Sequence, residues 1–374
     1  MKKFLILAGC FVLSFSFFGA GNAEAAYHFS NFKGRPPIHI LGGATKTPVG
    51  MTPAQIKSFY NLPAAGGHGT IVVVGAYDDK TIENDLSVFS KQFSLPLCTT
   101  TNGCFAKHPM TANVKANSGW AMETSLDIEW AHAIAPNAKI LLVEATTPSG
   151  ANLLKAVDYA ASVKDASAIS MSWGGAEFPE ELSLDSHFQS VSGAPFFASS
   201  GDNGAGASWP AASPNVIGVG GTTISLKSGG SFSKETAWSG SGGGVSAYEK
   251  EPSFQNDYSI PKAGGMRAIP DVSYDADPAS GYPVYLSTGT GSKAKGSWNT
   301  VGGTSAGAPQ WAAIRVLGGT AGLDKFYADK ASTSTLKYFR DITSGSNGTC
   351  KYYCDARKRY DYVTGLGSPQ TTKF

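Results

Sequence analysis

Residues 139–173 read KILLVEATTPSGANLLKAVDYAASVKDASAISMSW, which is an apolar run, a helical pattern and a second apolar run. We predict a strand over 139–143, a helix over 151–163 and another strand over 168–173. Strands that are apolar at every position are buried on both faces, which is typical of parallel sheets covered by helices. The stretch therefore indicates an α/β protein with a mainly parallel central sheet and helices on both faces.

The same alternation continues on both sides of this stretch. Further predicted strands cover 70–74, 195–199 and 216–219, and further predicted helices cover 82–93, 120–135 and 306–317. Ser118 stands where an N-cap would begin the 120–135 helix, and Pro136-Asn137 would end it. Ligands of such sheets bind beyond the carboxyl ends of the strands. Ser172-Trp-Gly-Gly175 and Ser200-Gly-Asp-Asn-Gly204 lie there, so we expect a site between them.

The first residues have the pattern of an exported protein. Lys2 and Lys3 precede an apolar stretch over 4–18, and small residues follow up to Ala26. This order predicts a cleaved signal peptide over 1–26 and a secreted protein, extracellular or periplasmic. Two alternatives remain open. A lipoprotein box ending at Cys10 would leave a leader of only nine residues, and a membrane anchor would need a longer apolar segment.

Two segments follow the leader. Residues 27–66 mix Pro, Gly and aromatic residues and predict a surface-wrapping N-terminal arm or short pro-region, and residues 67–374 form one predicted catalytic domain. Lys2, Lys3 and Glu24 leave with the leader, so the 30 basic and 28 acidic residues become 28 and 27, a formal charge of +1. A nearly neutral protein offers no basic surface for nucleic acid or an anionic membrane. We expect neither partner, and we expect a monomer.

Four cysteines remain once Cys10 is removed with the leader. Cys98 and Cys104 bracket a polar loop, and Cys350 and Cys354 bracket three residues. In an exported protein this spacing favours two local disulfides. Zinc binding is the weaker alternative because no histidine has ligand spacing beside either pair.

Two carboxylates have helical spacing in Glu123-Thr-Ser-Leu-Asp127. Residues four apart lie on the same face of a helix. Two carboxylates so close repel when both ionise, so one of them holds its proton more tightly and the pair can exchange a proton with a hydroxyl. The alternative is an exposed acidic face near a helix start, where the macrodipole favours acids. Glu129 lies on a different face and is predicted to be a surface acid.

Two further residues could complete such a site. Ser305 lies in Gly302-Gly-Thr-Ser305 before a helical run, where it would be well exposed as a nucleophile or would serve only as an N-cap. Asp202 follows an apolar strand and could donate to an oxyanion when protonated, or be a turn residue before Asn-Gly. His68 precedes the first strand and is interpreted as a turn residue, and His132 is interpreted as structural, so no histidine is assigned to catalysis.

Taken together, these motifs resemble the sedolisin family of serine-carboxyl peptidases over about residues 69–369. The motifs that carry the resemblance are Glu123-x-x-x-Asp127, Ala133-x-Ala-Pro-x-Ala138, Ser170-Met-Ser-Trp-Gly-Gly175, Ser199-Ser-Gly-Asp202, Trp209-Pro-Ala-Ala-Ser-Pro214, Gly302-Gly-Thr-Ser305-Ala and Thr364-Gly-x-Gly-Ser-Pro369. Several motifs in the family's order are far more specific than any one of them. The resemblance implies a subtilisin-like fold and an endopeptidase that hydrolyses unfolded proteins at acidic pH through an acyl-enzyme.

The resemblance also implies roles for individual residues. Ser305 would be the nucleophile and Glu123 its general base. Asp127 would orient and tune Glu123, and Asp202 would help to stabilise the oxyanion. The implied substrate-binding residues, beside an extended peptide, are Ser172, Trp173, Gly174, Gly175 and Gly243. One structural calcium ion is implied as well, with ligands at Asp341, Ile342, Arg357, Arg359 and Asp361.

The sequence departs from the family pattern in three places. Gly75 stands at the end of the first strand, where relatives often carry an acidic residue that supports the catalytic carboxylates; Asp78 or Asp79 could substitute for it. Arg357 and Arg359 occupy calcium positions that are usually glycine. The arm is much shorter than the usual folding prosegment. These departures leave open a catalytically impaired peptide-binding protein, or an adhesin-like secreted domain.

Overall fold

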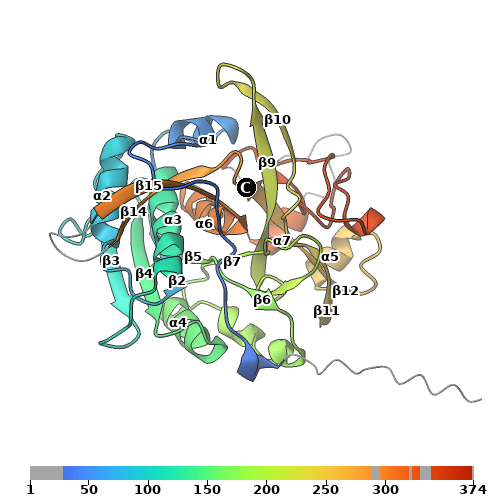
Figure 1. Cartoon of the computed structure of the whole chain (residues 1–374). Helices are drawn as coiled ribbons and strands as arrows, with labels where there is room; N and C mark the ends of the chain where they lie inside the picture. The colour runs from blue at the N-terminus through green and yellow to red at the C-terminus, as the bar shows by residue number, and fades with distance from the viewer. Residues whose placement is uncertain (1–27, 289–294, 320–321, 329–337, 373–374) are drawn as a thin grey trace, which may run out of the picture.

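A mostly parallel sheet runs through the centre of the computed structural model, which describes residues 28–288, 295–319, 322–328 and 338–372 (Figure 1). In spatial order its strands are β10 (Phe232–Ala237), β9 (Val216–Leu226), β7 (Phe196–Ser199), β5 (Ala166–Met171), β2 (Thr70–Ala76), β4 (Lys139–Ala145) and β3 (Phe105–Pro109), and β13 (Val272–Asp275) also pairs with β9. Within these described ranges, β10 is the one strand of this sheet antiparallel to its neighbour.

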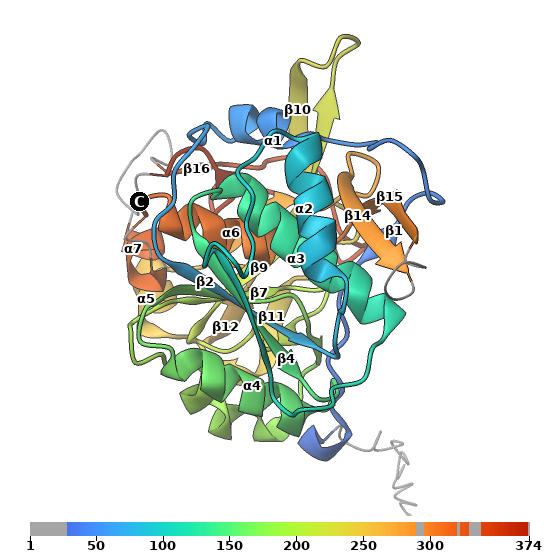
Figure 2. The ribbon, with the colours of Figure 1, turned by 90° about the vertical axis from the view of Figure 1, so that its left-hand side faces the viewer.

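Helices cover both faces of this sheet (Figure 2). One face carries α2 (Ile82–Gln92), α3 (Ser118–Ile134) and α6 (Gly307–Val316), and the other carries α4 (Gly150–Ser162). Alternate residues of β2 divide between the two layers. Ile71 and Val73 pack in the same cluster as the α3 and α6 side chains, whereas Val72 and Val74 pack with α4. The predicted α/β fold with helices on both faces is therefore confirmed.

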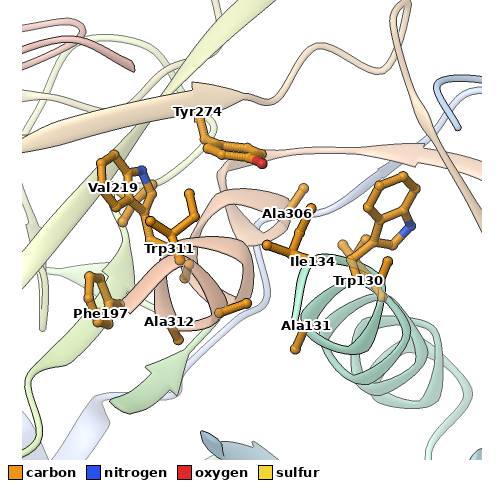
Figure 3. Close-up of a cluster of buried hydrophobic side chains, with 14 of the residues drawn as sticks. Trp130, Ala131, Ile134, Phe197, Val219, Tyr274, Ala306, Trp311 and Ala312 are labelled. Carbon is orange, nitrogen blue, oxygen red and sulfur yellow. The ribbon is translucent and has the colours of Figure 1, made fainter. Parts of the chain in front are cut away.

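The core between α3 and α6 holds the two helices in a fixed relation (Figure 3). Trp130 and Ile134 of α3 lie in one cluster with Trp311 of α6 and with Phe197 from the sheet. All four side chains are at most 1% exposed. Because interiors are close-packed, a shift of either helix would open a cavity that costs several kcal/mol. The side chains that α3 and α6 carry are therefore held in fixed positions relative to one another.

The remaining elements surround this central layer. β14 (Tyr282–Thr288) and β15 (Lys295–Gly302) form an antiparallel pair that β1 (His39–Ile40) extends. The short strand pairs are β6 (Gly175–Ala176) with β8 (Ser208–Trp209), β11 (Gly244–Lys250) with β12 (Met266–Ile269), and β16 (Phe339–Arg340) with β17 (Ser368–Pro369). The remaining α-helices of the described segments are α1 (Pro53–Phe59), α5 (Ser253–Tyr258) and α7 (Leu323–Ala328). Among these residues no helix combines the length and the apolar character that a membrane crossing requires.

Residues 28–66 are more deeply integrated than a surface-wrapping arm. Phe32 near its start and Ile56 and Tyr60 near its end are 0–1% exposed. The α1 helix begins with a capping box between Thr52 and Gln55 and packs into the main core. The predicted arm thus does more than wrap the surface, because both of its ends bury aromatic or aliphatic side chains.

Most local predictions agree with the structure. Both disulfides form as predicted, between Cys98 and Cys104 and between Cys350 and Cys354. The 120–135 helix begins earlier than predicted, at Ser118, because the N-cap is Asn117, whose side chain accepts from the amides of residues 119 and 120. The predicted signal peptide lies outside the described residues and stays a prediction.

Candidate active site

Glu123 and Asp127 lie on the buried side of α3. They are 1% and 2% exposed, so the alternative of an exposed acidic face was wrong. The Ser172 hydroxyl donates to Asp127 Oδ1 (2.6 Å) and also to the Ser305 carbonyl (3.2 Å). Burial raises the pKa of the Asp127 carboxyl, and the Ser172 hydrogen bond only partly offsets this rise. Ser172 thus joins the carboxyl pair to the segment that carries Ser305.

Glu123 is the more strongly perturbed member of the pair. Burial, and then the charge of Asp127, raise the pKa of its carboxyl well above the ordinary range, while the nearby Ser305 hydroxyl lowers it and Asp202 raises it. Among the described residues, neither of its buried carboxyl oxygens has a hydrogen-bond partner. A buried carboxyl with a raised pKa is a candidate for proton exchange at a functional site, and the Ser305 hydroxyl is the adjacent group.

Ser305 sits in a short 3₁₀ turn, Thr304–Ala306, that leads into α6. It is completely buried, so the prediction of a well-exposed serine was wrong. Its hydroxyl donates to the Pro37 carbonyl at 2.8 Å, and its amide faces the same oxygen at 3.5 Å. Gly303, which comes just before this turn, has φ of +132°, and a Cβ there would lie 2.1 Å from the Pro37 oxygen. Glycine at 303 therefore leaves room for a peptide carbonyl beside the serine.

Asp202 approaches the same point from the loop after β7. Its Oδ1 accepts from both the amide and the hydroxyl of Thr304, each at 2.8 Å. Its Oδ2 faces His39 Nε2 at 3.2 Å. Burial raises the pKa of the Asp202 carboxyl, although the His39 contact and the Thr304 donors lower it. With Oδ1 fixed by Thr304, Oδ2 is the oxygen that can carry a proton, and it lies close to Gly303, where an added Cβ would come within 2.5 Å of it.

The arm crosses this site as an extended peptide (Figure 1). The amide and carbonyl of Arg35 pair with the carbonyl and amide of Gly174, at 3.0 and 3.1 Å. Beyond Pro37, β1 runs antiparallel to the end of β15, with His39 opposite Gly302. A chain held on both sides of Ser305 by main-chain hydrogen bonds has the geometry of a peptide bound by strand addition.

A model of the subtilase family matches residues 66–318, well over half of the chain. The chain belongs to the subtilase family. Its similarities within that family are to sedolisins. It is similar to kumamolisin from Bacillus sp. (strain MN-32), 31% identical over 86% of this chain and 62% of that protein. It is similar to sedolisin from Pseudomonas sp. (strain 101), 27% identical over 88% of this chain and 62% of that protein. The chain thus spans less than two thirds of the length of these relatives.

A solved structure supports the same relationship. The structure of Pseudomonas sedolisin, a serine-carboxyl proteinase complexed with two molecules of pseudo-iodotyrostatin, matches this subtilase with a TM-score of 0.69 and 27% identity. The match covers 88% of this chain and 96% of that chain. It confirms the subtilisin-like fold implied by the sequence motifs.

The implied substrate-binding residues of this subtilase have different surroundings. Gly174 contacts the arm directly, and Ser172 reaches Asp127 through its hydroxyl. Trp173 is buried and donates through its indole nitrogen to the Val74 carbonyl, so its side chain is structural. Gly175 pairs with β8 and packs against Phe32 of the arm. Gly243 pairs with residues 205 and 206, and no bond joins it to the arm within the described ranges.

The implied calcium loop of the subtilase is closed by its own hydrogen bonds. Asp361 Oδ1 accepts from the amides of Val363 and Thr364, and Oδ2 accepts from the Arg357 amide and the Thr364 hydroxyl, at 2.8–3.0 Å. Asp341 Oδ2 accepts from the Arg359 amide at 2.9 Å. Carboxylate oxygens that accept from amide N–H groups, here those of Arg357 and Arg359 among others, have fewer lone pairs to offer a cation. No step is assigned to calcium, which stays a prediction with the expected ligands Asp341, Ile342, Arg357, Arg359 and Asp361.

One prediction about a nearby acid was wrong. Glu129 is completely buried and accepts from the Tyr285 amide at 3.0 Å, so it is not a surface acid. Asp78 and Asp79, either of which could substitute for an acid at Gly75, bind Lys107 (2.6 Å) and accept from Thr81, respectively. A Cβ at Gly75 would meet only Thr124, at 3.8 Å. Gly75 of this subtilase therefore has room for a side chain next to Thr124 of α3.

Pro37 and His39 were missed by sequence reasoning. Their partners, Ser305 and Asp202, lie 268 and 163 residues away in the chain, and no local pattern marks such contacts. The only hint was the pair Pro36-Pro37, which favours an extended backbone. The remaining sequence-predicted residues Ser305, Glu123, Asp127 and Asp202 are brought together as expected.

Proposed function

We propose that the chain is an exported serine-carboxyl endopeptidase that cleaves unfolded proteins at acidic pH. The observation that supports this most directly is the peptide carbonyl of Pro37 on the Ser305 hydroxyl, beside the buried carboxyls of Glu123 and Asp202. A hydroxyl, a proton acceptor and a donor near one carbonyl are the parts that acyl transfer requires. The similarity to kumamolisin and sedolisin favours the same reaction.

The proposed reaction has two halves. Ser305 Oγ attacks the scissile carbonyl carbon while Glu123 takes the hydroxyl proton, and the oxyanion receives hydrogen bonds from the Ser305 amide and from protonated Asp202. Glu123 then returns the proton to the leaving amine as the C–N bond breaks. Water attacks the resulting ester in the same way and regenerates Ser305. Asp127, held by Ser172, keeps Glu123 oriented throughout.

The two carboxyl roles each limit the pH range of the proposed reaction. Glu123 accepts a proton only while the Glu123–Asp127 pair carries a negative charge, and burial raises the pKa of both carboxyls, so activity falls once acid has protonated both. Asp202 donates only while it is protonated, so activity falls as the pH rises through the pKa of Asp202, which burial raises. The product is a bell-shaped dependence between these two limits.

Asp202 offers a sharp test of this assignment. Asp202→Ala is expected to lower kcat by roughly 10²–10³, the usual loss for one oxyanion donor. Asp202→Asn should keep most of the activity, because its carbonyl oxygen can accept from Thr304 while its NH₂ group donates at any pH. The measurement is kcat against pH with an unstructured fluorogenic peptide. The alkaline fall of the profile should move to higher pH in the Asn variant and stay in place if Asp202 has another role.

A catalytically impaired peptide-binding protein is the second candidate. Gly75 favours it, because the resemblance implies an acidic residue at this position that would support the carboxyl pair. The two candidates differ in one measurement. An endopeptidase releases new amino termini from a denatured protein at about pH 4, where ordinary carboxyls begin to take up protons. A peptide-binding protein retains the same substrate intact.

A further inference from the structure

A buried histidine lies against the disulfide between Cys98 and Cys104. The two sulfur atoms and a ring nitrogen of His132 all lie within 4.8 Å of one another. Cys98 and His132 are fully buried, whereas Cys104 is half-buried. No local spacing marks His132 as a ligand, because it belongs to α3 whereas both cysteines precede β3. The fold thus supplies this cysteine pair with a histidine, which the spacing of the sequence did not.

One ring nitrogen of His132 is fixed and the other is unused. Nε2 lies 2.7 Å from the Pro96 carbonyl oxygen, which can only accept, so Nε2 carries the ring proton. Nδ1 is buried and has no hydrogen-bond partner among the described residues. Burial and the positive charge of Lys57 both disfavour a protonated ring, so Nδ1 keeps a lone pair. A histidine that donates to a carbonyl through one nitrogen and offers the other has the arrangement of a metal ligand.

The loop between the two cysteines has its own hydrogen bonds besides the disulfide. Asn102 Oδ1 accepts from the amides of Thr99 and Cys104, each at 3.1 Å. The Asn102 NH₂ group donates to the Leu97 carbonyl at 2.8 Å. The Cys104 carbonyl accepts from the Ile140 amide at 2.8 Å, which joins the loop to β4. The disulfide spans a sequence separation of only 6, and cross-links that close short loops stabilise a fold least. Both cysteines should therefore stay beside the imidazole after reduction.

We propose that the reduced chain binds one divalent metal ion of the zinc class through Cys98, Cys104 and His132. The proposal is independent of the function proposed for Ser305. Two thiolates and an imidazole are ligands that zinc prefers, and they leave one tetrahedral position for water. An ion at roughly 2.3 Å from each sulfur and roughly 2.0 Å from the nitrogen needs ligand atoms about 3.5–3.8 Å apart. Two separate thiolates can adopt that spacing, whereas two bonded sulfurs cannot.

Reduction and metal binding are two balanced steps. Two equivalents of a thiol reductant become one small-molecule disulfide and leave Cys98 and Cys104 as free thiols. The metal ion then binds both sulfurs as thiolates and displaces their two protons. The two thiolate charges cancel the charge of the ion, so Lys57 faces a neutral site. Cys104, which is half-buried, is the sulfur that a reductant can reach. The disulfide and the metal ion are therefore alternative ways of closing the same loop.

The test measures metal binding by the reduced chain and needs no turnover. Every protein carries Cys10→Ser, is reduced by a phosphine without oxygen, and is titrated with Co²⁺ at about pH 7.5. The parent should bind one Co²⁺ per chain with a thiolate-to-cobalt charge-transfer band, which Zn²⁺ removes by displacing the cobalt. The oxidised parent should show no band. His132→Gln should bind more than about 100-fold more weakly, since even an outer partner of a metal ligand contributes roughly 10–100-fold to affinity.

Two matched controls accompany these proteins. His108→Gln removes a histidine of β3 that stacks on Tyr159, with ring centroids 3.6 Å apart, and that is not part of the cluster. It should bind Co²⁺ as tightly as the parent. A variant with both Cys98→Ser and Cys104→Ser keeps the second cysteine pair, which no described histidine approaches as closely. It should show no charge-transfer band.

Three results would overturn the metal site. They are a reduced parent that binds neither Co²⁺ nor Zn²⁺, equal affinity of the parent and His132→Gln, and an equal band in the double cysteine variant. Circular dichroism follows the fold during each titration. A reduced parent that unfolds and is not refolded by Zn²⁺ would also count against the site, because an ion that binds only the folded chain must stabilise it. Failure of the peptidase assignment would leave all of these results unchanged.

Discussion

Replacing Ser305 by alanine is expected to abolish peptide hydrolysis, lowering turnover by more than about 10⁴-fold. In the proposed reaction Ser305 supplies the oxygen that forms the acyl bond, and the hydroxyls of Ser172 and Thr304 cannot take its place, because they donate to Asp127 and Asp202. The fold should persist, since the lost hydroxyl makes a single hydrogen bond, to Pro37. A change in unfolding free energy of about 1 kcal/mol is expected. Peptide cleavage at about pH 4 and thermal unfolding measure the two effects.

Ser273→Ala is the matched control for this variant. Ser273 is also completely buried, and its hydroxyl has no hydrogen-bond partner within the described part of the chain. Its loss should leave turnover unchanged. Residual turnover by Ser305→Ala above a tenth of the parent value would exclude Ser305 as the nucleophile.

Replacing Glu123 by glutamine is expected to lower turnover by about 10³–10⁴-fold, because an amide cannot accept the Ser305 proton. The same change should stabilise the fold at neutral pH. Glu123 has a folded-state pKa raised by burial and by Asp127, so its contribution to stability is complete below the ordinary glutamate pKa. That contribution is lost as the pH rises through the raised value. Glutamine cannot ionise, so the variant should gain stability over the parent at about pH 7 but not at about pH 4.

Glu129→Gln separates the effect of Glu123→Gln on turnover from its effect on stability. Glu129 is on the same helix and completely buried, and burial raises the pKa of its carboxyl well above the ordinary range. It lies away from Ser305, where it accepts from the Tyr285 amide, and glutamine can still accept there. Its replacement should give a similar gain in stability at neutral pH with unchanged turnover. A loss of activity as large as that of Glu123→Gln would show that burial of a charge, and not proton transfer, explains the first result.

The fold could be predicted because its signals are local. The apolar runs of β2, β4 and β5 and the helical pattern of α4 each depend on a few adjacent residues, and parallel sheets bury both faces of such strands. The β14–β15 pair could not be predicted, because one of its faces is partly polar and its burial depends on α3, more than 100 residues earlier. The N-cap was misplaced by one residue, since Asn117 and Ser118 are both good caps.

The residues of the candidate site could be predicted from the sequence, but their burial could not. The spacing of Glu123 and Asp127 places both on one helical face whatever surrounds them. Whether that face is exposed depends on the packing of α3 against α6, which no helical pattern reveals when the helix is buried on nearly all sides. The contact of Pro37 with Ser305 joins residues 268 apart in the chain, which only the tertiary fold brings together. Sequence reasoning therefore placed the serine in solvent, whereas the arm covers it.

The central claim is that a proton shared among buried carboxyls activates Ser305 in place of an imidazole. The most direct measurement is acid quenching of the reaction with a peptide ester at about pH 4, followed by peptide mapping in a mass spectrometer. The account predicts an acyl group on Ser305 in the parent chain, and at least a hundredfold slower acylation in Glu123→Gln. Acylation of a different residue, or an equal rate in the two proteins, would contradict it.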